Sequence, residues 1–173
     1  MTDVSTASVG AGSGGEGDLA LRVAKLEAIE EIRRLKLVYA KHCDSGYPPE
    51  PLAALFTEDA VWEGGERFGT HRGRQAVYDF FDSLSADLVF AMHFMIGDTI
   101  EVSDDLKTAT GSWQLLEPCS LIVDGEKRSM LFSGHYADEY RRESDGWKFA
   151  KVELVFNIQA RTDVGWAEKQ IQL

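Results

Sequence analysis

The sequence predicts an α+β fold in which helices come first along the chain and a β-sheet follows. From Leu19 to Tyr39 the apolar residues recur at steps of three and four, a spacing typical of an amphipathic helix. After residue 86 the apolar residues alternate with polar ones, which is typical of strands with one buried face. We therefore expect helices segregated to one side of an antiparallel sheet.

The length, charge and cysteine content of the chain indicate how many domains, which partners and which compartment to expect. Its 173 residues fit one domain. The formal net charge of −11 repels phosphate backbones, so no nucleic-acid partner is expected. No apolar run approaches the ~20 residues of a membrane span, so no membrane partner is expected either. The two cysteines, Cys43 and Cys119, lie far apart, which predicts a reduced, cytoplasmic protein.

Residues 1–18 are rich in glycine and serine. This composition predicts a disordered tail, followed by a single domain over residues 19–173. The tail contains the pattern G-x-G-x-x-G at Gly10, Gly12 and Gly15. A dinucleotide-binding loop of this pattern must follow a buried strand. No strand precedes these glycines, so we expect no such cofactor.

The first half of the chain predicts three helices and one short strand. The first helix begins at Leu19, and Ser45-Gly46 followed by two prolines terminates it. A short helix is predicted over residues 51–56, with a proline at its start. A short strand is predicted over residues 60–62. The third helix is predicted over residues 73–84, whose apolar side chains lie at i, i+3, i+4 and i+7.

Four long strands are predicted in the second half of the chain, over residues 88–102, 108–123, 129–142 and 147–161. Short turn segments rich in Asp, Gly and Ser separate them. Strands in this order form hairpins and hence an antiparallel sheet. A curved sheet wrapped around helices leaves a concave pocket at its open end.

Candidate catalytic residues are His93 and Asp44. His93 lies in an otherwise apolar segment, where loss of solvation keeps an imidazole neutral and able to accept a proton. Asp44 lies at the end of the first predicted helix, where a carboxylate opposes the helix dipole and calls for a cationic partner. The alternatives are a histidine satisfied within the core and an aspartate solvated in a turn.

Aromatic and polar side chains of the strands are candidates for lining a hydrophobic pocket. Glu117 is a carboxylate whose pKa an apolar pocket would raise, unless it is a surface glutamate near the strand end. His135 is a second pocket histidine if its face of the strand is internal. The predicted pocket residues are Trp62, Phe90, Trp113, Glu117, Phe132, His135, Phe156 and Asn157.

Three segments of the sequence resemble a known family. The segment LFTEDAVW spans residues 55–62, GHYADEY spans residues 134–140 and DGWKF spans residues 145–149. With Tyr39 and Asp44 on the first helix and His93 on a strand, they are similar to the SnoaL-like branch of the NTF2-like superfamily. The resemblance implies a cone-shaped α+β barrel: a curved antiparallel sheet wrapped around N-terminal helices.

The resemblance also implies roles for three residues. Dehydratase-like members use a His–Asp pair as general base, and His93 and Asp44 occupy those places. Tyr39 matches a tyrosine that polarises the substrate. Dehydrochlorinase-like members carry in addition a lysine and an arginine that this chain lacks, which counts against dehydrochlorination.

The residues and the resemblance together predict a cofactor-independent acid–base enzyme, a lyase of dehydratase type or an isomerase. Its substrate is expected to be a small hydrophobic cyclic molecule. Two alternatives stay open: a non-catalytic ligand-binding or scaffold module, like a ring-hydroxylating dioxygenase small subunit, and a polyketide-type cyclase. The resemblance implies a homodimer or homotrimer. No metal is expected, because no metal-ligand spacing occurs, and an iron triad of His93, His135 and Asp44 lacks a recognisable motif.

Overall fold

The structure, a computed structural model, describes residues 15–171. The predicted tail lies outside the described residues up to residue 14, including Gly10 and Gly12. The first helix begins at Gly15, four residues before the predicted start at Leu19. The third glycine of the G-x-G-x-x-G pattern therefore opens a helix.

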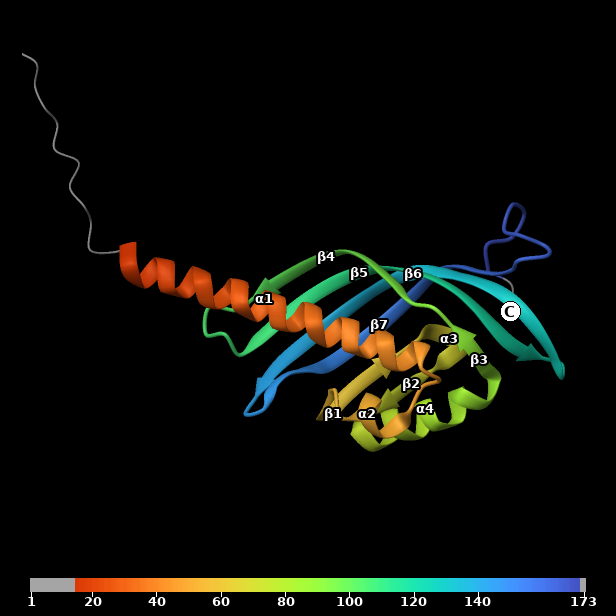
Figure 1. Cartoon of the computed structure of the whole chain (residues 1–173), viewed down its shortest axis with the longest axis horizontal. Helices are drawn as coiled ribbons and strands as arrows, with labels where there is room; N and C mark the ends of the chain where they lie inside the picture. The colour runs from red at the N-terminus through yellow and green to blue at the C-terminus, as the bar shows by residue number, and fades with distance from the viewer. Residues whose placement is uncertain (1–14, 172–173) are drawn as a thin grey trace, which may run out of the picture.

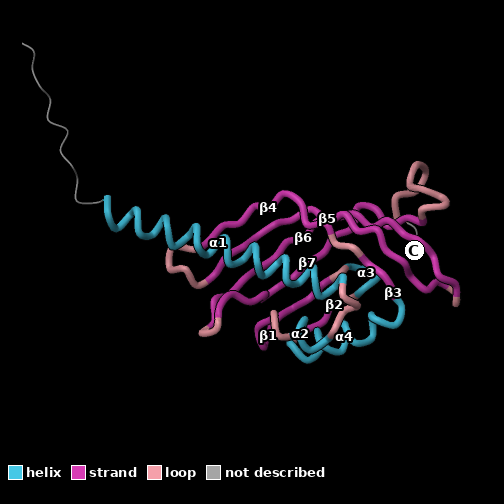
Figure 2. Tube along the Cα trace, viewed as in Figure 1, coloured by secondary structure: helices cyan, strands magenta, loops and turns pink. Residues whose placement is uncertain are grey.

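Helices and strands follow the predicted α+β order (Figure 2). In chain order, the elements are α1 (Gly15–Asp44), α2 (Pro49–Ala53), β1 (Phe56–Glu63), α3 (Gly65–Phe68), β2 (Thr70–Arg72), α4 (Arg74–Asp87), β3 (Leu88–Ala91), β4 (Phe94–Val102), β5 (Thr108–Val123), β6 (Glu126–Glu143) and β7 (Gly146–Arg161).

The boundaries of the shorter elements differ from the predicted ones. The second helix lies over Pro49–Ala53 rather than residues 51–56, and α4 extends to Asp87. Strand β1 begins at Phe56, because pairing with β7 extends it beyond the three residues that the sequence predicted. The short elements α3 and β2 were not predicted, since each has only three or four residues and carries no periodic signal.

The strands form one seven-stranded sheet in the order β2-β1-β7-β6-β5-β3, and β4 also pairs with β5. The long hairpins β5–β6 and β6–β7 are antiparallel, as predicted. The expectation of a wholly antiparallel sheet is wrong, because β1 pairs with β7 in parallel. These two strands are far apart in the sequence, so no hairpin turn fixes their relative direction.

The predicted strand over residues 88–102 is divided into β3 and β4, with Met92 and His93 between them. Both pieces pair with β5, where Ala91 opposes Cys119 and Phe94 opposes Leu116. Opposite the break lies Pro118, which has no N–H to donate to a neighbouring strand. The Pro118 carbonyl accepts the backbone N–H of Met92 at 3.1 Å, and the backbone N–H of His93 donates to a side chain of α1 instead.

The concave face of the sheet holds the core of the protein. Alternate residues of β5 and β6 are buried, as expected for a sheet with one covered face. Helix α1 crosses this face, and α2 and α4 lie together beside its C-terminal end (Figure 1). Tyr39 of α1 packs edge-on against Phe56, Phe81, Tyr136 and Phe149. This aromatic cluster attaches the helices to the sheet.

A buried ion pair joins α1 to β6. Lys36 Nζ donates to Asp138 Oδ2 at 2.8 Å, and both side chains have no exposed surface. The ammonium also lies 3.4 Å from the centre of the Tyr136 ring, a favourable cation–π contact. The Tyr140 hydroxyl donates to the same carboxylate at 2.8 Å and accepts from Trp113 Nε1 at 3.1 Å. The segment Y-x-D-x-Y is thus a polar anchor within the core.

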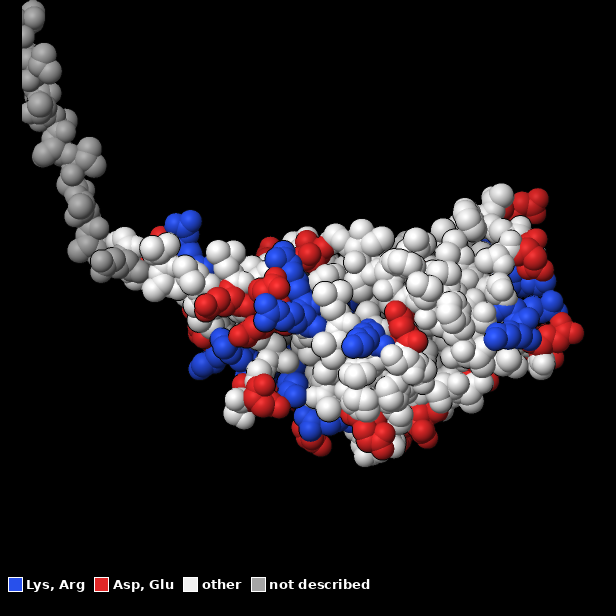
Figure 3. Space-filling model, in the orientation of Figure 1, with Lys and Arg blue, Asp and Glu red and all other residues white. Residues whose placement is uncertain are grey.

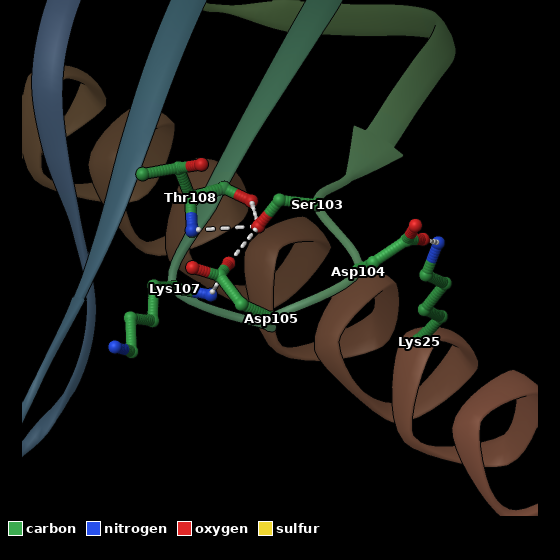
Figure 4. Close-up of polar contacts among 6 residues, drawn as sticks. All are labelled: Lys25, Ser103, Asp104, Asp105, Lys107 and Thr108. Atoms are coloured by element: carbon green, nitrogen blue, oxygen red, sulfur yellow. Dashed lines mark hydrogen bonds and ion pairs between the residues drawn. The ribbon is translucent and has the colours of Figure 1, made fainter.

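The turn between β4 and β5 contacts the N-terminal half of α1. Lys25 Nζ lies 2.6 Å from Asp104 Oδ1 in this turn (Figure 4). The turn itself is closed by the Ser103 hydroxyl, which donates to Asp105 Oδ1 at 2.6 Å, and by the Lys107 N–H, which donates to the same oxygen at 3.1 Å. The sheet therefore holds the helix at both ends of their contact.

Breaking the Lys36–Asp138 pair is expected to destabilise the protein strongly. Lys36→Met or Asp138→Asn each leaves one buried group without its partner, which typically costs about 3–5 kcal/mol. The double variant is expected to recover part of that loss, because no buried charge is left alone. Urea unfolding followed by tryptophan fluorescence measures all three.

The matched control is Lys25→Met, which removes a lysine from the exposed pair with Asp104 and is expected to change the unfolding free energy little. Single variants at Lys36 and Asp138 that unfold at the same urea concentration as the wild type would contradict the account.

Candidate active site

The end of helix α1 brings Asp44 against His93. The helix stops at Asp44, and the chain turns through Gly46, whose φ of 89° favours glycine. Asp44 Oδ1 accepts the backbone N–H of His93 at 2.8 Å and lies 2.8 Å from His93 Nδ1. One carboxylate oxygen thus satisfies the N–H that β5 leaves unpaired and also orients the imidazole ring.

This contact fixes how the imidazole carries its proton. A carboxylate only accepts hydrogen bonds, so His93 Nδ1 carries the hydrogen that Asp44 binds. In the neutral ring Nε2 then holds the lone pair. His93 Nε2 lies 3.6 Å from Glu117 Oε2, and both residues line one internal cavity. The basic nitrogen is therefore on the cavity side of the ring.

Glu117 lies on β5 with its side chain in the interior. The residue is 3% exposed, so the alternative of a surface glutamate is wrong. Glu117 faces inward because the odd-numbered residues of β5 are the buried ones. Within the described part of the chain, no hydrogen-bond donor reaches its Oε1. Burial, with a smaller contribution from Asp44, raises the pKa of the Glu117 carboxyl.

Opposing effects act on the pKa of His93. Burial lowers it, because a charged imidazolium is poorly solvated in the interior. When Glu117 is ionised its negative charge raises the pKa of His93, and so does the hydrogen bond to Asp44; the net result is a raised pKa. Two carboxyl groups beside one imidazole hold their protons jointly. The imidazole and the two carboxyl groups are therefore placed to exchange protons with one another.

The cavity is small and largely aromatic. Its volume is about 20 Å³, room for about one water molecule. Six of the predicted site residues line it: Tyr39, Trp62, His93, Glu117, Phe132 and Phe156. The sequence analysis missed the others, which are Tyr47, Phe68, Phe80, Phe81, Leu84, Leu88, Tyr136 and Leu154.

Tyr39 reaches the cavity from the middle of α1. Its side chain is buried, and its hydroxyl oxygen accepts a hydrogen bond from Trp62 Nε1 at 3.1 Å. Burial raises the pKa of the Tyr39 phenol well above its ordinary value. The hydroxyl is therefore a neutral group that keeps its proton for donation.

Four predicted pocket residues do not line the cavity. Phe90 is exposed, and Trp113 is buried against Tyr140. His135 lies on the outer side of β6, because the even-numbered residues of that strand are the buried ones. Asn157 is exposed on β7. With His135 on the outer face, the iron triad with His93 and Asp44 does not form.

Tyr47 is the nearest aromatic neighbour that the sequence analysis missed. Its ring centre lies 6.1 Å from that of His93, edge to face. Tyr47 adopts a positive φ of 57°, which is uncommon for a bulky residue. Tyr47 lies just after the Ser45-Gly46 turn, outside any periodic segment, so no pattern in the sequence indicated its inward direction.

No group of three or more His, Cys, Asp or Glu side chains among the described residues is arranged to hold a metal ion. Within the same range, no helix has the length and apolar character that crossing a membrane requires.

The chain belongs to the SnoaL-like domain family, which matches residues 24–153. The matched segment contains Tyr39, Asp44, His93 and Glu117. The fold agrees with that of the family, a curved sheet partly closed around N-terminal helices, and related solved structures are described as NTF2-like with a cystatin-like fold.

Particular relatives are similar over most of the chain. The γ-hexachlorocyclohexane dehydrochlorinase of Sphingobium indicum is 28% identical over 138 residues, which cover 79% of this chain and 83% of that protein. An NTF2-like protein of Novosphingobium aromaticivorans is 29% identical with a TM-score of 0.61, covering 90% and 96% of the two chains. A candidate scytalone dehydratase of the same species has a TM-score of 0.69 at 24% identity, covering 90% and 99%.

Replacing Asp44 with asparagine is expected to lower the pKa of His93. The substitution removes the negative charge that favours the imidazolium and leaves only a weaker, neutral acceptor for His93 Nδ1. NMR titration of the imidazole protons measures the change. The exposed Asp82→Asn is the matched control and is expected to leave the titration unchanged. An unaltered His93 titration in Asp44→Asn would contradict the assigned contact.

The same substitution makes a prediction for stability. A folded-state pKa raised above the unfolded value of ~6.5 adds stability that is complete below that value and is lost as the pH rises through the folded pKa. The stability that Asp44→Asn loses is therefore expected to be larger in mild acid than at alkaline pH. Urea unfolding at the two pH values measures the difference, and equal losses would count against it.

Proposed function

We propose that the protein is a cofactor-independent acid–base enzyme of the lyase or isomerase type. The observation that carries the proposal is the 2.8 Å contact between Asp44 and His93 at an internal cavity. It leaves His93 Nε2 as a basic nitrogen facing that cavity. The dehydrochlorinase relative supports the lyase class, because dehydrochlorination is an elimination.

In this proposal His93 Nε2 removes a proton from a carbon next to an activating carbonyl. Asp44 keeps the imidazole in the orientation that presents Nε2 and stabilises the imidazolium that forms, as the carboxylate does in a serine protease triad. The Tyr39 hydroxyl donates a hydrogen bond to the oxygen on which negative charge develops. All three roles use groups already oriented by the fold.

We propose a small hydrophobic cyclic substrate. Aromatic rings such as Trp62, Phe80 and Phe132 form much of the cavity wall, and they favour apolar rings as ligands. A cavity of about 20 Å³ does not hold a ring without movement of its wall. The half-buried side chains of Phe68, Leu84 and Phe156 are the ones that we expect to move.

The small cavity also favours one alternative function. A side-chain core that nearly fills the site suits a non-catalytic ligand-binding or scaffold module, like the small subunit of a ring-hydroxylating dioxygenase. A polyketide-type cyclase would use the same pocket with another substrate. Loss of a measurable proton transfer on removal of His93 distinguishes the enzyme from the scaffold.

For the compartment we propose the reducing cytoplasm. Cys43 and Cys119 are both unbridged and buried, as is usual in proteins of reducing compartments. Burial raises the pKa of both thiols, which keeps them protonated and unreactive.

We further propose that the outer face of the sheet joins identical chains into a dimer or trimer. Phe94 and Ile96 on β4, Leu116 on β5 and Val155 on β7 are large apolar residues that are exposed. Phe94 pairs directly with Leu116 across the two strands. Figure 3 shows the opposite, helix-covered side, where charged groups gather around α1 and near the β5–β6 hairpin, whereas the outer face carries the exposed apolar residues named above. Apolar patches of this kind mark interfaces.

His93→Ala is expected to abolish proton abstraction. General base catalysis typically contributes ~10²–10⁴-fold, so a loss of about that size is expected. The measurement is deuterium exchange at the α-carbon of cyclohexanone in heavy water, followed by NMR. The control is His42→Ala, since His42 lies on α1 near Asp44 but outside the cavity lining. Exchange by His93→Ala at the wild-type rate, or no exchange by the wild type, would refute the enzyme proposal.

Ile96→Glu is expected to dissociate the oligomer, because it places a charge beside the exposed apolar residue Phe94 on the outer face of β4. Size-exclusion chromatography with light scattering measures the mass of the particle. Glu101→Lys, an exposed charge reversal on the same strand, is the control. A monomeric wild type, or an assembly that Ile96→Glu leaves intact, would contradict the interface.

A further inference from the structure

The carboxyl group of Glu117 has no structural role that the described residues explain. It is buried beside His93, and its Oε1 atom has no hydrogen-bond partner there. The other buried carboxyl group of the sheet, Asp138, is held by Lys36 and Tyr140. An unpartnered buried polar atom costs stability and calls for a functional explanation.

The position of Glu117 fits a group that acts on a bound molecule. It lines the same cavity as His93 and Tyr39, and its Oε2 lies 3.6 Å from His93 Nε2. The closest cation of the core, Lys36, is already bound to Asp138. Among residues 15–171, no cationic side chain lines the cavity besides His93. The surroundings thus favour the neutral, proton-bearing carboxyl over the carboxylate.

We propose that Glu117 is the general acid of this site and that the substrate therefore loses a hydroxyl group rather than a halide. The inference rests on the proposed function, in which His93 is the base. Hydroxide is a poor leaving group and needs a proton as the C–O bond breaks, whereas chloride leaves as the anion. A carboxylic acid within the cavity supplies that proton.

The complete step balances without any further reactant. His93 Nε2 takes the proton from the α-carbon, and the electron pair of that C–H bond forms the new C=C bond. The C–O bond breaks, its electron pair stays on oxygen, and the Glu117 carboxyl gives its proton to that oxygen. The products are an unsaturated ring and water, with His93 as imidazolium and Glu117 as carboxylate.

His93 and Glu117 can return to their starting protonation states without another residue. After the step the imidazolium proton is on His93 Nε2, facing Glu117 Oε2 at 3.6 Å. Transfer of this proton to the carboxylate, directly after a small approach or through the product water, restores both groups. The proton that leaves the carbon thereby becomes the proton available for the next leaving group. Asp44 keeps the imidazole in place throughout.

The test separates the acid from the base with Glu117→Gln, which keeps the shape of the side chain and removes the acidic proton. The probes are β-hydroxycyclohexanone, β-chlorocyclohexanone and cyclohexanone. We expect elimination of water to fall by ~100-fold or more. Elimination of chloride and exchange of the cyclohexanone α-proton are expected to fall far less than elimination of water, because both need only the base.

Each other outcome is decisive. Unchanged elimination of water by Glu117→Gln overturns the inference and leaves the proposed function standing. Equal losses in exchange and in both eliminations also overturn it, because Glu117 would then act only through the basicity of His93. Exchange absent already in the wild type refutes the proposed function itself.

A measurement without substrate guards against a variant that fails to fold. Infrared spectra of protein with isotope-labelled glutamate are expected to show a protonated carboxyl band at neutral pH. That band is expected to vanish in Glu117→Gln and to persist in Glu139→Gln, a control on the exposed side of β6. Absence of the band from the wild type overturns the inference.

Discussion

The interaction on which the rest of the site depends is the double hydrogen bond from His93 to Asp44. The carboxylate stands at the C-terminal end of a long helix, where the helix dipole disfavours it. Two donors from one residue compensate for that position. The same contact supplies an acceptor for the backbone where Pro118 interrupts the pairing of β5. The contact therefore links the C-terminal end of α1 to the break between β3 and β4. It also orients the imidazole of His93.

Around this contact the fold distributes its charges unequally. Lys36 and Asp138 neutralise each other deep in the core, while the imidazole of His93 has a carboxyl group on each side. One of these, Asp44, reaches solvent, and the other, Glu117, does not. Burial separates the two groups, because it raises the pKa of the Glu117 carboxyl. One carboxyl group thus orients the base His93, and the other is the proposed acid.

The sequence predicted most of the architecture, since the long strands have a clear period of two and the first helix a clear period near 3.6. It also identified Asp44, His93 and Tyr39, with the help of family resemblance. The break at Met92 and His93 escaped it, because the cause is a proline on a neighbouring strand. Burial of Glu117 and exposure of His135 depend on which face of each strand is internal, and alternation alone does not decide that. Tyr47 was not predicted, because the turn after α1 sets the inward direction of its side chain.

The central claim is that Asp44 holds the imidazole with Nε2 as the basic nitrogen facing the cavity. The most direct test is a nitrogen–proton correlation NMR spectrum of the His93 ring in neutral solution. The account predicts a hydrogen on Nδ1 and none on Nε2 for the neutral ring, and loss of this preference in Asp44→Asn. A neutral wild-type ring with its hydrogen on Nε2 would contradict the account, because no basic nitrogen would then face the cavity.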